Sequence, residues 1–532
     1  MRYFKFNTIM NVDTLITNGH FVTLDEFIPE CEAIAIDEGK IVWIGTNKEA
    51  KGFKSPEVID LKGAYVYPGF IDSHIHVLYS GIIQKTLRLE GCQNHESVVD
   101  RLKTQVAQTA PGEWILGFGW DDCSWPKENK LHASTLDAVS PHNPVVLQRS
   151  DTHLIWVNSR ALKEASIDEK NPDPVGGKIV RDEKGNPTGV LIDTASYLVR
   201  AVMPSLDVDR AVLLTLEMLE ACAKNGITMV HDASTIQPNF EAFKALASSG
   251  SLPIRVYAMT TIKPDMKIES IIEPLQQSPF FESRCLKFFM DGSLGSRGAA
   301  LLEPYTDDSH EGLLLWNKED LVSLLKIAKD KGFQVAAHAI GDRANRFILD
   351  AYEEVGVEDL RWRVEHAQLL SRQDIPRFKS LQIIAAMQPL HAMTDMAWIE
   401  SRVGSKRAQE EAFVWKSLLD AGAIIAGGSD APVVNLNPLW GIYAATTRQN
   451  VDGEPKEGWV PHEKVSRLEA LKMYTTNAAY AGFHEHDLGS ISKGKWADLV
   501  VYPENILTCD ANKLLILPVL YTFVNGKVIY KA

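Results

Sequence analysis

The sequence predicts an α/β protein built on a TIM-like (β/α)8 barrel, with a small β-sandwich made from both termini and an inserted α/β subdomain. Two observations support this fold class. Short apolar runs alternate with amphipathic helical segments over most of the chain, a pattern typical of parallel strand pairing. The chain also has 532 residues, about twice the length of a lone barrel, so additional modules are expected.

Both ends of the chain have the residue pattern of β-hairpins. Asn18-Gly19, Glu38-Gly39 and Asn525-Gly526 each separate two apolar runs, which indicates tight two-residue turns. An isolated hairpin is only marginally stable in water. We therefore expect residues 1–63 and 487–532 to pair with each other in one composite β-sandwich.

Eight apolar runs between these ends are candidates for barrel strands. They cover residues 64–71, 227–230, 255–260, 286–290, 334–337, 362–365, 382–387 and 424–426. Helical segments lie between several of them; residues 317–331, for example, begin with a suitable N-cap and are followed by Gly332. Residues 64–90 and 196–486 are accordingly assigned to the barrel.

The interval between the first two strand candidates is far longer than one connecting helix requires. Residues 91–195 are rich in Trp, Pro and Gly and contain short strand candidates at 145–148 and 178–180. This segment is interpreted as an inserted α/β subdomain over the mouth of the barrel.

Potential metal ligands lie at or near the carboxyl ends of several predicted barrel strands, where an α/β barrel builds its active site. These residues are His74, His76, Lys287, His338, His366 and Asp430. His74 and His76 are two positions apart, so on a strand they point to the same side and can reach one ion together. The set favours a divalent metal, by default zinc, with one or two ions bound.

Each of these residues also has an ordinary structural interpretation. His338 and His366 could be hydrogen-bonded core histidines, and Asp430 could form a turn before Pro432. Lys287 could pair with an acid such as Asp291. Alternatively, burial could lower the pKa of Lys287 enough for its neutral amine to add carbon dioxide and become a carbamate ligand.

The bulk properties restrict the class of partner and the compartment. A formal net charge of −14 disfavours a nucleic-acid or anionic-membrane partner. The six cysteines show no close pairing, and neither a signal peptide nor an apolar run of the ~20 residues of a transmembrane helix is evident. We expect a cytoplasmic enzyme with a small-molecule substrate, and the sequence leaves a homodimer open.

Several segments resemble the metal-dependent amidohydrolase superfamily. PGFIDSHIH and GSISKGKWADLVVY are similar to the superfamily as a whole, and GWDDCSWP, GGKIVRDEKGNPTGVL, KFFMDGSLGSR and HAIGDRA resemble its subgroup related to N-substituted formamide deformylase, amidohydrolase family 3. The resemblance implies two ions, one bound by His74, His76 and Asp430 and one by His338 and His366, with N6-carboxylated Lys287 as the bridge. Asp193 and Thr152 depart from the subgroup pattern, in which Glu and Gly are common.

The resemblance also implies a reaction, the hydrolysis of a non-peptide carbon–nitrogen bond in an amide, N-acyl or N-formyl compound. A metal-bridging hydroxide would attack the carbonyl carbon, with Asp430 as general base and then general acid. The alternatives are a mononuclear deaminase and a catalytically silent scaffold. The deaminase alternative is weakened because Gly341 occupies the position at which its proton-shuttling Glu is expected.

Four further residues are predicted to bind the substrate because they are expected near the barrel mouth. They are Trp120, His153, Arg297 and His391. Structural alternatives are core packing for Trp120, an ion pair for Arg297 and a structural hydrogen bond for His391.

Overall fold

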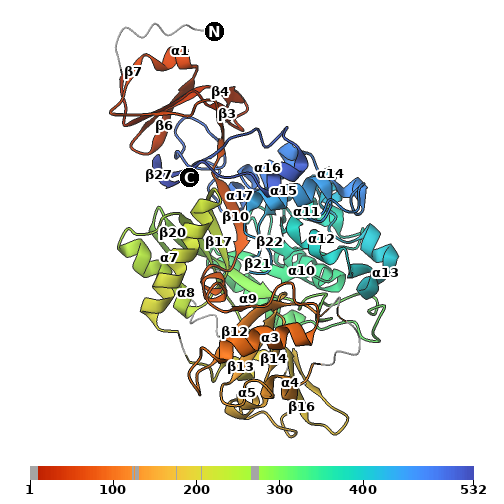
Figure 1. The fold of residues 1–532 in the computed structure, drawn as a ribbon. Coiled ribbons are helices and arrows are strands. Elements are labelled where there is room, and N and C mark those ends of the chain that lie inside the picture. Colours follow the sequence, from red (N-terminus) through yellow and green to blue (C-terminus); the bar gives the residue numbers. More distant parts are fainter. Residues whose placement is uncertain are drawn as a thin grey trace.

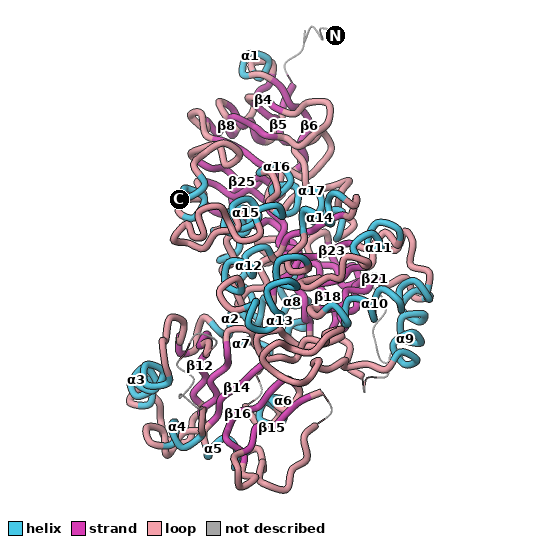
Figure 2. The backbone as a smooth tube through the Cα atoms, turned by 90° about the vertical axis from the view of Figure 1, so that its right-hand side faces the viewer, coloured by secondary structure: helices cyan, strands magenta, loops and turns pink. Residues whose placement is uncertain are grey.

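The computed structural model describes residues 10–122, 125, 131–174, 176–204, 206–264, 266 and 275–532. Sheets from the two termini lie at one end of the molecule, the barrel lies in the middle, and the insert lies at the other end (Figures 1 and 2). None of the helices in these residues has the length and apolar composition that a membrane crossing demands.

The centre is a nearly closed barrel of eight parallel strands, which confirms the predicted fold class. In sheet order the strands are β10 (Phe70–Ile75), β17 (Ile227–Thr235), β18 (Arg255–Thr261), β20 (Phe281–Phe289), β21 (Gln334–Ala339), β22 (Arg363–His366), β23 (Ile384–Met387) and β24 (Ile424–Gly427). β19 (Leu275–Ser278) adds an antiparallel pair to β20. Beyond the strand ends, Asp430 N donates to His74 O at 2.7 Å, and His76 N donates to Ala431 O at 2.9 Å. These bonds join the last strand to the first.

Helices cover the outside of the barrel and bury one large apolar core against it. They are α2 (Val77–Ile83), α7 (Val208–Lys224), α8 (Gln237–Ser248), α9 (Lys318–Asp330), α10 (Asp342–Val355), α11 (Ile375–Ser380), α12 (Pro389–Asp395), α13 (Ile399–Glu410), α14 (Trp415–Asp420), α15 (Pro438–Thr447), α16 (Arg467–Met473) and α17 (Thr476–Ala481). The expected cap of α9 is present, because the Asn317 side chain accepts a hydrogen bond from Asp320 N.

The predicted first barrel strand, residues 64–71, is two strands in the structure. β9 (Tyr65–Pro68) belongs to a terminal sheet, and the barrel begins at Phe70 with β10. Pro68 has no N–H to donate to a ladder. Gly69 N donates to Asp498 O at 2.8 Å, next to β25, whereas Phe70 N donates to Gly226 O at 3.0 Å, next to β17, so the chain passes from the terminal sheet into the barrel between these two residues.

The two chain ends form a pair of facing sheets with a common core. One sheet contains β27 (Lys527–Lys531), β26 (Tyr521–Val524), β25 (Leu499–Tyr502), β9, β3 (His20–Val22) and β4 (Glu30–Cys31). The other contains β6 (Lys40–Gly45), β5 (Ala33–Asp37), β2 (Thr14–Thr17) and β8 (Glu57–Asp60). The short strands β1 (Met10–Asn11) and β7 (Phe53–Lys54) and helix α1 (Asn47–Ala50) lie beside them. Ile16, Ile34, Val66 and Leu499 are fully buried in the shared core.

Two of the three predicted hairpins are confirmed. β5 and β6 pair antiparallel around Glu38-Gly39, and β26 and β27 pair around Asn525-Gly526. The hairpin predicted at Asn18-Gly19 is wrong, because β2 pairs with β5 and β8 whereas β3 pairs with β9 and β4. The chain crosses between the two sheets here, so that both flanking strands reach the same core from opposite sides.

The insert is a mixed sheet with short helices. Its strands, in sheet order, are β11 (Leu87–Arg88), β12 (Ile115–Trp120), β13 (Val145–Arg149), β14 (Leu154–Val157), β16 (Pro187–Asp193) and β15 (Gly177–Arg181). Its helices are α3 (His95–Val106), α4 (Ala133–Asp137), α5 (Ser159–Glu164) and α6 (Ser196–Arg200). Trp156 and Ile155, adjacent on β14, belong to separate apolar clusters, so both faces of this sheet are packed.

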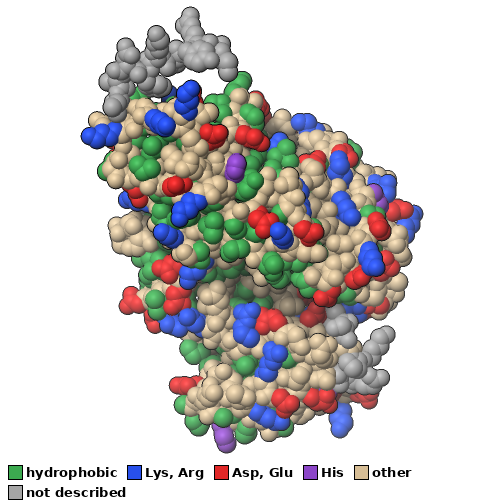
Figure 3. Space-filling view, turned by 45° about the horizontal axis from the view of Figure 1, so that its top comes forward, with side chains coloured by type: hydrophobic (Ala, Val, Ile, Leu, Met, Phe, Trp, Pro, Cys, Tyr) green, Lys and Arg blue, Asp and Glu red, His purple; other side chains and the backbone are tan. Residues whose placement is uncertain are grey.

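The surface and the cysteines show ordinary features. Lys and Arg side chains are interspersed with Asp and Glu side chains on the face shown in Figure 3, so the charges of this face are mixed rather than segregated.

The free cysteines are Cys31, Cys92, Cys222, Cys285 and Cys509, and Cys123 lies outside the described residues.

A buried ion pair connects the barrel to the terminal sheets. Arg255 of β18 contacts the Asp498 carboxylate at two points, at 3.0 Å through Nε and 3.2 Å through Nη2. Both side chains are 3% exposed. Asn525 N also donates to Asp498 Oδ1, at 2.8 Å. One carboxylate therefore fixes the β26–β27 turn and the barrel relative to each other.

Asp498→Asn is expected to lower the free energy of unfolding by about 3–5 kcal/mol, because it leaves the buried Arg255 guanidinium without an anionic partner. Chemical denaturation followed by tryptophan fluorescence measures the change. Glu217→Gln serves as the control, since it breaks the more exposed Lys85–Glu217 pair and should cost about 1 kcal/mol or less. Equal denaturation midpoints for the two variants would contradict this role of Asp498.

Candidate metal centre

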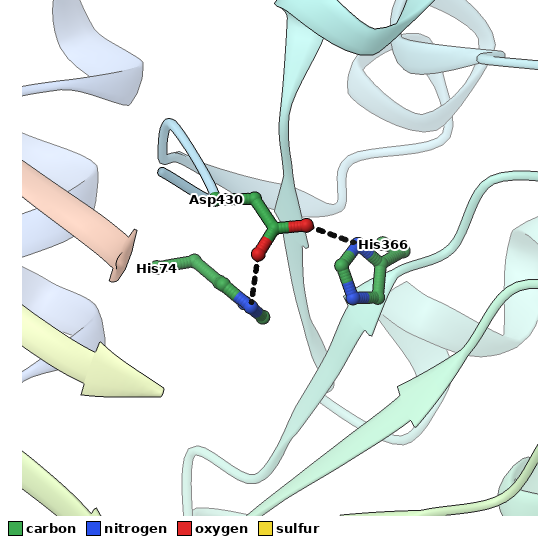
Figure 4. A group of neighbouring side chains, drawn as sticks. All are labelled: His74, His366 and Asp430. Carbon is green, nitrogen blue, oxygen red and sulfur yellow. Dashed lines mark ion pairs between the residues drawn. The ribbon is translucent and has the colours of Figure 1, made fainter. Parts of the chain in front are cut away.

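Side chains from three separate segments converge at the carboxyl end of the barrel (Figure 4). Asp430 Oδ1 lies 3.4 Å from His74 Nε2 and 3.1 Å from His76 Nε2, and Asp430 Oδ2 lies 4.0 Å from His366 Nδ1. His74, His366 and Asp430 are buried, and each offers one ligand atom within 4.8 Å of the others. The structure thus brings together four of the six predicted ligands, with three imidazoles around the carboxylate of Asp430.

The other two predicted ligands, His338 and Lys287, lie beside this group. The His338 ring centroid is 4.6 Å from that of His366. Lys287 is fully buried, with Nζ 5.1 Å from the centre of the Phe289 ring. Burial lowers the pKa of its amine to about 8, and the nearby carboxylates of Glu365 and Asp430 only partly oppose this shift.

The alternative interpretation of Lys287, a salt bridge to Asp291, is not supported, because the Asp291 carboxylate has other partners. Asp291 accepts hydrogen bonds from the backbone N–H groups of Ile340, Gly341 and Ala300, at 3.0, 2.8 and 2.9 Å. Burial raises the pKa of the Asp291 carboxyl to about 7, although these bonds favour its charged form. Asp291 therefore fixes the loops that follow β20 and β21 rather than neutralising the lysine.

Several nitrogens at this centre are buried with no hydrogen-bond partner among the described residues. They are His74 Nε2, Lys287 Nζ, His338 Nε2 and His391 Nε2. Leaving a buried polar group unsatisfied costs about 1–3 kcal/mol, so such a concentration of them requires an explanation. A divalent cation would accept the imidazole lone pairs, and Asp430 would supply an anionic oxygen. The residues present therefore fit a bound divalent metal ion.

The backbone at the centre has unusual conformations that place the ligands. Asp430 has φ 56° and His366 has φ 71°, in the left-handed region that non-glycine residues seldom adopt. Gly428 permits the close approach of the β24 loop to β10, because a Cβ there would lie 2.6 Å from His74 N. Burial opposes the charge of Asp430, but His74 and His76 hold the pKa of its carboxyl well below the usual range.

Two polar residues that sequence reasoning missed orient the histidines. Glu365 Oε2 accepts a hydrogen bond from His74 Nδ1 at 2.5 Å, and Gln388 Oε1 accepts one from His366 Nδ1 at 2.7 Å. Such bonds fix which ring nitrogen carries the proton. Burial disfavours the charge of Glu365, but Arg363 and His74 outweigh it and hold the pKa of the Glu365 carboxyl at about 2. One indication of their role is present in the sequence, because both residues, like the predicted ligands, lie at strand ends.

Two of the four predicted substrate-binding residues lie at this centre. His391 Nε2 is 3.5 Å from Asp430 Oδ2, and its ring stacks on that of His366 with centroids 6.0 Å apart. His153 comes from the insert, and its ring centroid is 5.7 Å from that of His338. His153 Nδ1 donates to Asp193 Oδ1 at 2.7 Å. The insert therefore contributes a histidine to the centre formed by the barrel.

The other two predicted substrate-binding residues have structural partners instead. Trp120 is fully buried in the core of the insert, where its Nε1 donates to Leu147 O at 3.1 Å. Arg297 contacts Asp307 at two points, at 3.1 and 2.8 Å. The structure thus favours the packing interpretation of Trp120 and the ion-pair interpretation of Arg297, with Asp307 rather than Asp291 as the acid.

Comparison with known proteins assigns this architecture to a family. Residues 57–530 match the sequence profile described as "Amidohydrolase family". The chain is 36% identical to Protein LONG AFTER FAR-RED 3 of Arabidopsis thaliana, over 97% of this chain and 91% of that protein. It is 28% identical to the N-substituted formamide deformylase of Arthrobacter pascens, over 98% of each.

A solved structure is similar to this chain over most of its length. The crystal structure of an uncharacterized metal-dependent hydrolase from Pyrococcus horikoshii OT3 is similar to this chain with a TM-score of 0.77 and 28% identity, over 94% of this chain and 99% of that one. The resemblance found in the sequence motifs is confirmed, and because the family profile covers most of its length, this chain belongs to the amidohydrolase family.

Proposed function

We propose that this protein is a metal-dependent hydrolase that cleaves a non-peptide carbon–nitrogen bond, in an amide, N-acyl or N-formyl group of a small molecule. The observation that carries the proposal is the buried grouping of His74, His366 and Asp430, beside nitrogens that have no hydrogen-bond partner among the residues that the structure describes. Membership of the amidohydrolase family and full-length similarity to an N-substituted formamide deformylase support the choice of bond.

The metal that we propose is zinc, in one or two ions. The residues that would hold it are His74, His76 and Asp430 for one ion and His338 and His366 for a second, with Lys287 between them. A bound divalent ion polarises a carbonyl oxygen and makes water more acidic. The lowered pKa of Lys287, about 8, supports its carboxylation, because the neutral amine attacks carbon dioxide and loses one proton to form the N6-carboxylate.

Asp430 is the residue that we assign to proton transfer. Its carboxylate would accept a proton from the attacking water as the oxygen bonds to the carbonyl carbon. When the carbon–nitrogen bond breaks, Asp430 would deliver that proton to the departing nitrogen, so that the products are a carboxylic acid and an amine. Its backbone bond to His74 O and its left-handed conformation support a fixed position for this carboxylate.

His153 and His391 would hold the substrate from two sides of the centre. His391 Nε2 is buried without a hydrogen-bond partner in the described part of the chain, and His153 is anchored by Asp193 through its other nitrogen. Each ring thus has one nitrogen available for a polar group of the substrate. The location of His153 on the insert suggests that this subdomain helps to select the substrate.

The deaminase alternative has less support from the geometry. A Cβ at Gly341, where the proton-shuttling Glu is expected, would lie 2.0 Å from Ala300 O. A side chain at this position would therefore require the loop after β20 to move, and we retain carbon–nitrogen hydrolysis of an amide as the proposed reaction.

Asp430→Asn is expected to lower turnover by about 10²–10⁴-fold, because the neutral amide cannot accept the proton, while much of the bound metal is kept. A hydrolysis screen of N-formyl, N-acyl and cyclic amides with the zinc-loaded protein identifies the substrate, and elemental analysis reports the metal. Asp374→Asn is the matched control, since Asp374 is also buried but pairs with Arg346 at 2.9 Å. Unchanged turnover in Asp430→Asn at full metal occupancy would show that Asp430 does not transfer the proton.

Protein purified without chelators is expected to contain about one or two divalent ions per chain. Removing them should abolish hydrolysis and lower the thermal unfolding midpoint, because an ion that binds only the folded state stabilises it. Adding zinc back should restore both properties. Metal-free protein with an unchanged midpoint after zinc addition would favour the silent scaffold instead.

His153→Asn is expected to raise KM for the identified substrate by about tenfold, which corresponds to one lost hydrogen bond, with the same metal content. Steady-state kinetics and elemental analysis give the two quantities. His142→Asn, on the exposed side of the insert, is the control and should leave KM unchanged. Wild-type KM in His153→Asn would exclude it from substrate binding.

A further inference from the structure

A buried ion pair lies in the interior of the barrel, within one strand. Arg363 and Glu365 are two residues apart on β22, so their side chains point to the same side of the sheet. Arg363 Nε donates to Glu365 Oε1 at 2.7 Å, and Arg363 Nη2 donates to Glu365 Oε2 at 3.1 Å. Both residues are fully buried.

The pair reaches across the barrel to strands that are not its neighbours. Arg363 Nη2 donates to Ser73 O of β10 at 2.7 Å, and Arg363 Nη1 donates to His231 Nδ1 of β17 at 3.0 Å. Among the described strands β22 pairs with β21 and β23, so its contacts with β10 and β17 pass through the barrel interior. On the same side, Glu365 accepts the hydrogen bond from His74 Nδ1.

These contacts determine which nitrogen of His74 is available to a cation. A carboxylate can only accept a hydrogen bond, so the proton of His74 lies on Nδ1. The lone pair of Nε2 is then free, and this nitrogen lies 3.4 Å from Asp430 Oδ1. Arg363 also holds the peptide group just before His74 through Ser73 O, so both the ring and the backbone of this ligand are fixed.

A buried ion pair is not expected at this level of the barrel on stability grounds. Barrel interiors are usually filled by bulky apolar side chains. Replacing a buried ion pair by such side chains often leaves the stability of a protein unchanged or raises it. The hydrogen bond from His74 to Glu365 gives a different reason for the presence of these two charged residues in the interior.

We propose that Arg363 and Glu365 are positioning residues for the candidate metal centre, which hold His74 in the tautomer and orientation that bind a divalent cation. The inference rests on the proposed function, because it assumes that His74 is a ligand. It goes further by assigning part of the metal affinity to two side chains that do not themselves touch the ion.

The test measures zinc affinity of the metal-free protein by competition with a chromophoric chelator. Glu365→Gln keeps the side-chain volume but removes the charge, and it is expected to weaken zinc binding by about 10–100-fold. Asp498→Asn is the matched control, since it breaks another buried Arg–carboxylate pair, which lies between the barrel and the terminal sheets. It should lower stability without changing the zinc affinity.

A double variant separates positioning from folding. Arg363→Met with Glu365→Leu replaces the whole pair by apolar side chains, and we expect it to fold, with an unfolding midpoint near that of the wild type, yet to bind zinc about 10–100-fold more weakly. Wild-type zinc affinity in this double variant, or in folded Glu365→Gln, would overturn this inference and leave the proposed function standing. A wild-type protein that binds no zinc would overturn the proposed function as well.

Discussion

The candidate centre depends on one buried carboxylate that lies within reach of imidazoles from separate parts of the chain. Asp430 faces His74 near the end of β10, His76 just after this strand, His366 at the end of β22 and His391 on α12. The same residue helps to join the last strand to the first, because its backbone N–H donates to His74 O. The residue that gathers the imidazoles therefore also contributes a backbone bond between the last strand and the first.

The barrel and the insert make different contributions to this centre. The barrel supplies the strand ends, together with Glu365 and Gln388, which orient two of the histidines. The insert supplies His153, held by Asp193 in a short hydrogen bond. The proposed metal chemistry thus belongs to the barrel, while the proposed contact of His153 with the substrate depends on how the insert packs over it.

Much of the barrel could be predicted from the sequence because each strand is an apolar run followed by a polar turn. That local pattern was sufficient to place His338, His366 and Asp430 near strand ends. The role of Glu365 could not be predicted in the same way, because it depends on which strands face each other across the closed barrel. Likewise, the Asn18-Gly19 pattern describes a turn correctly but does not reveal that the two strands enter different sheets.

The arrangement of the terminal sheets has a consequence for how the chain is made. β9 pairs with β25, with Pro68 opposite Leu499, so an early strand depends on one of the last. During synthesis on the ribosome, β9 emerges early, and its edge that pairs with β25 stays unpaired until almost the whole polypeptide has been translated. Premature termination within the barrel would leave β9 without β25, which makes incomplete products targets for chaperones and proteases.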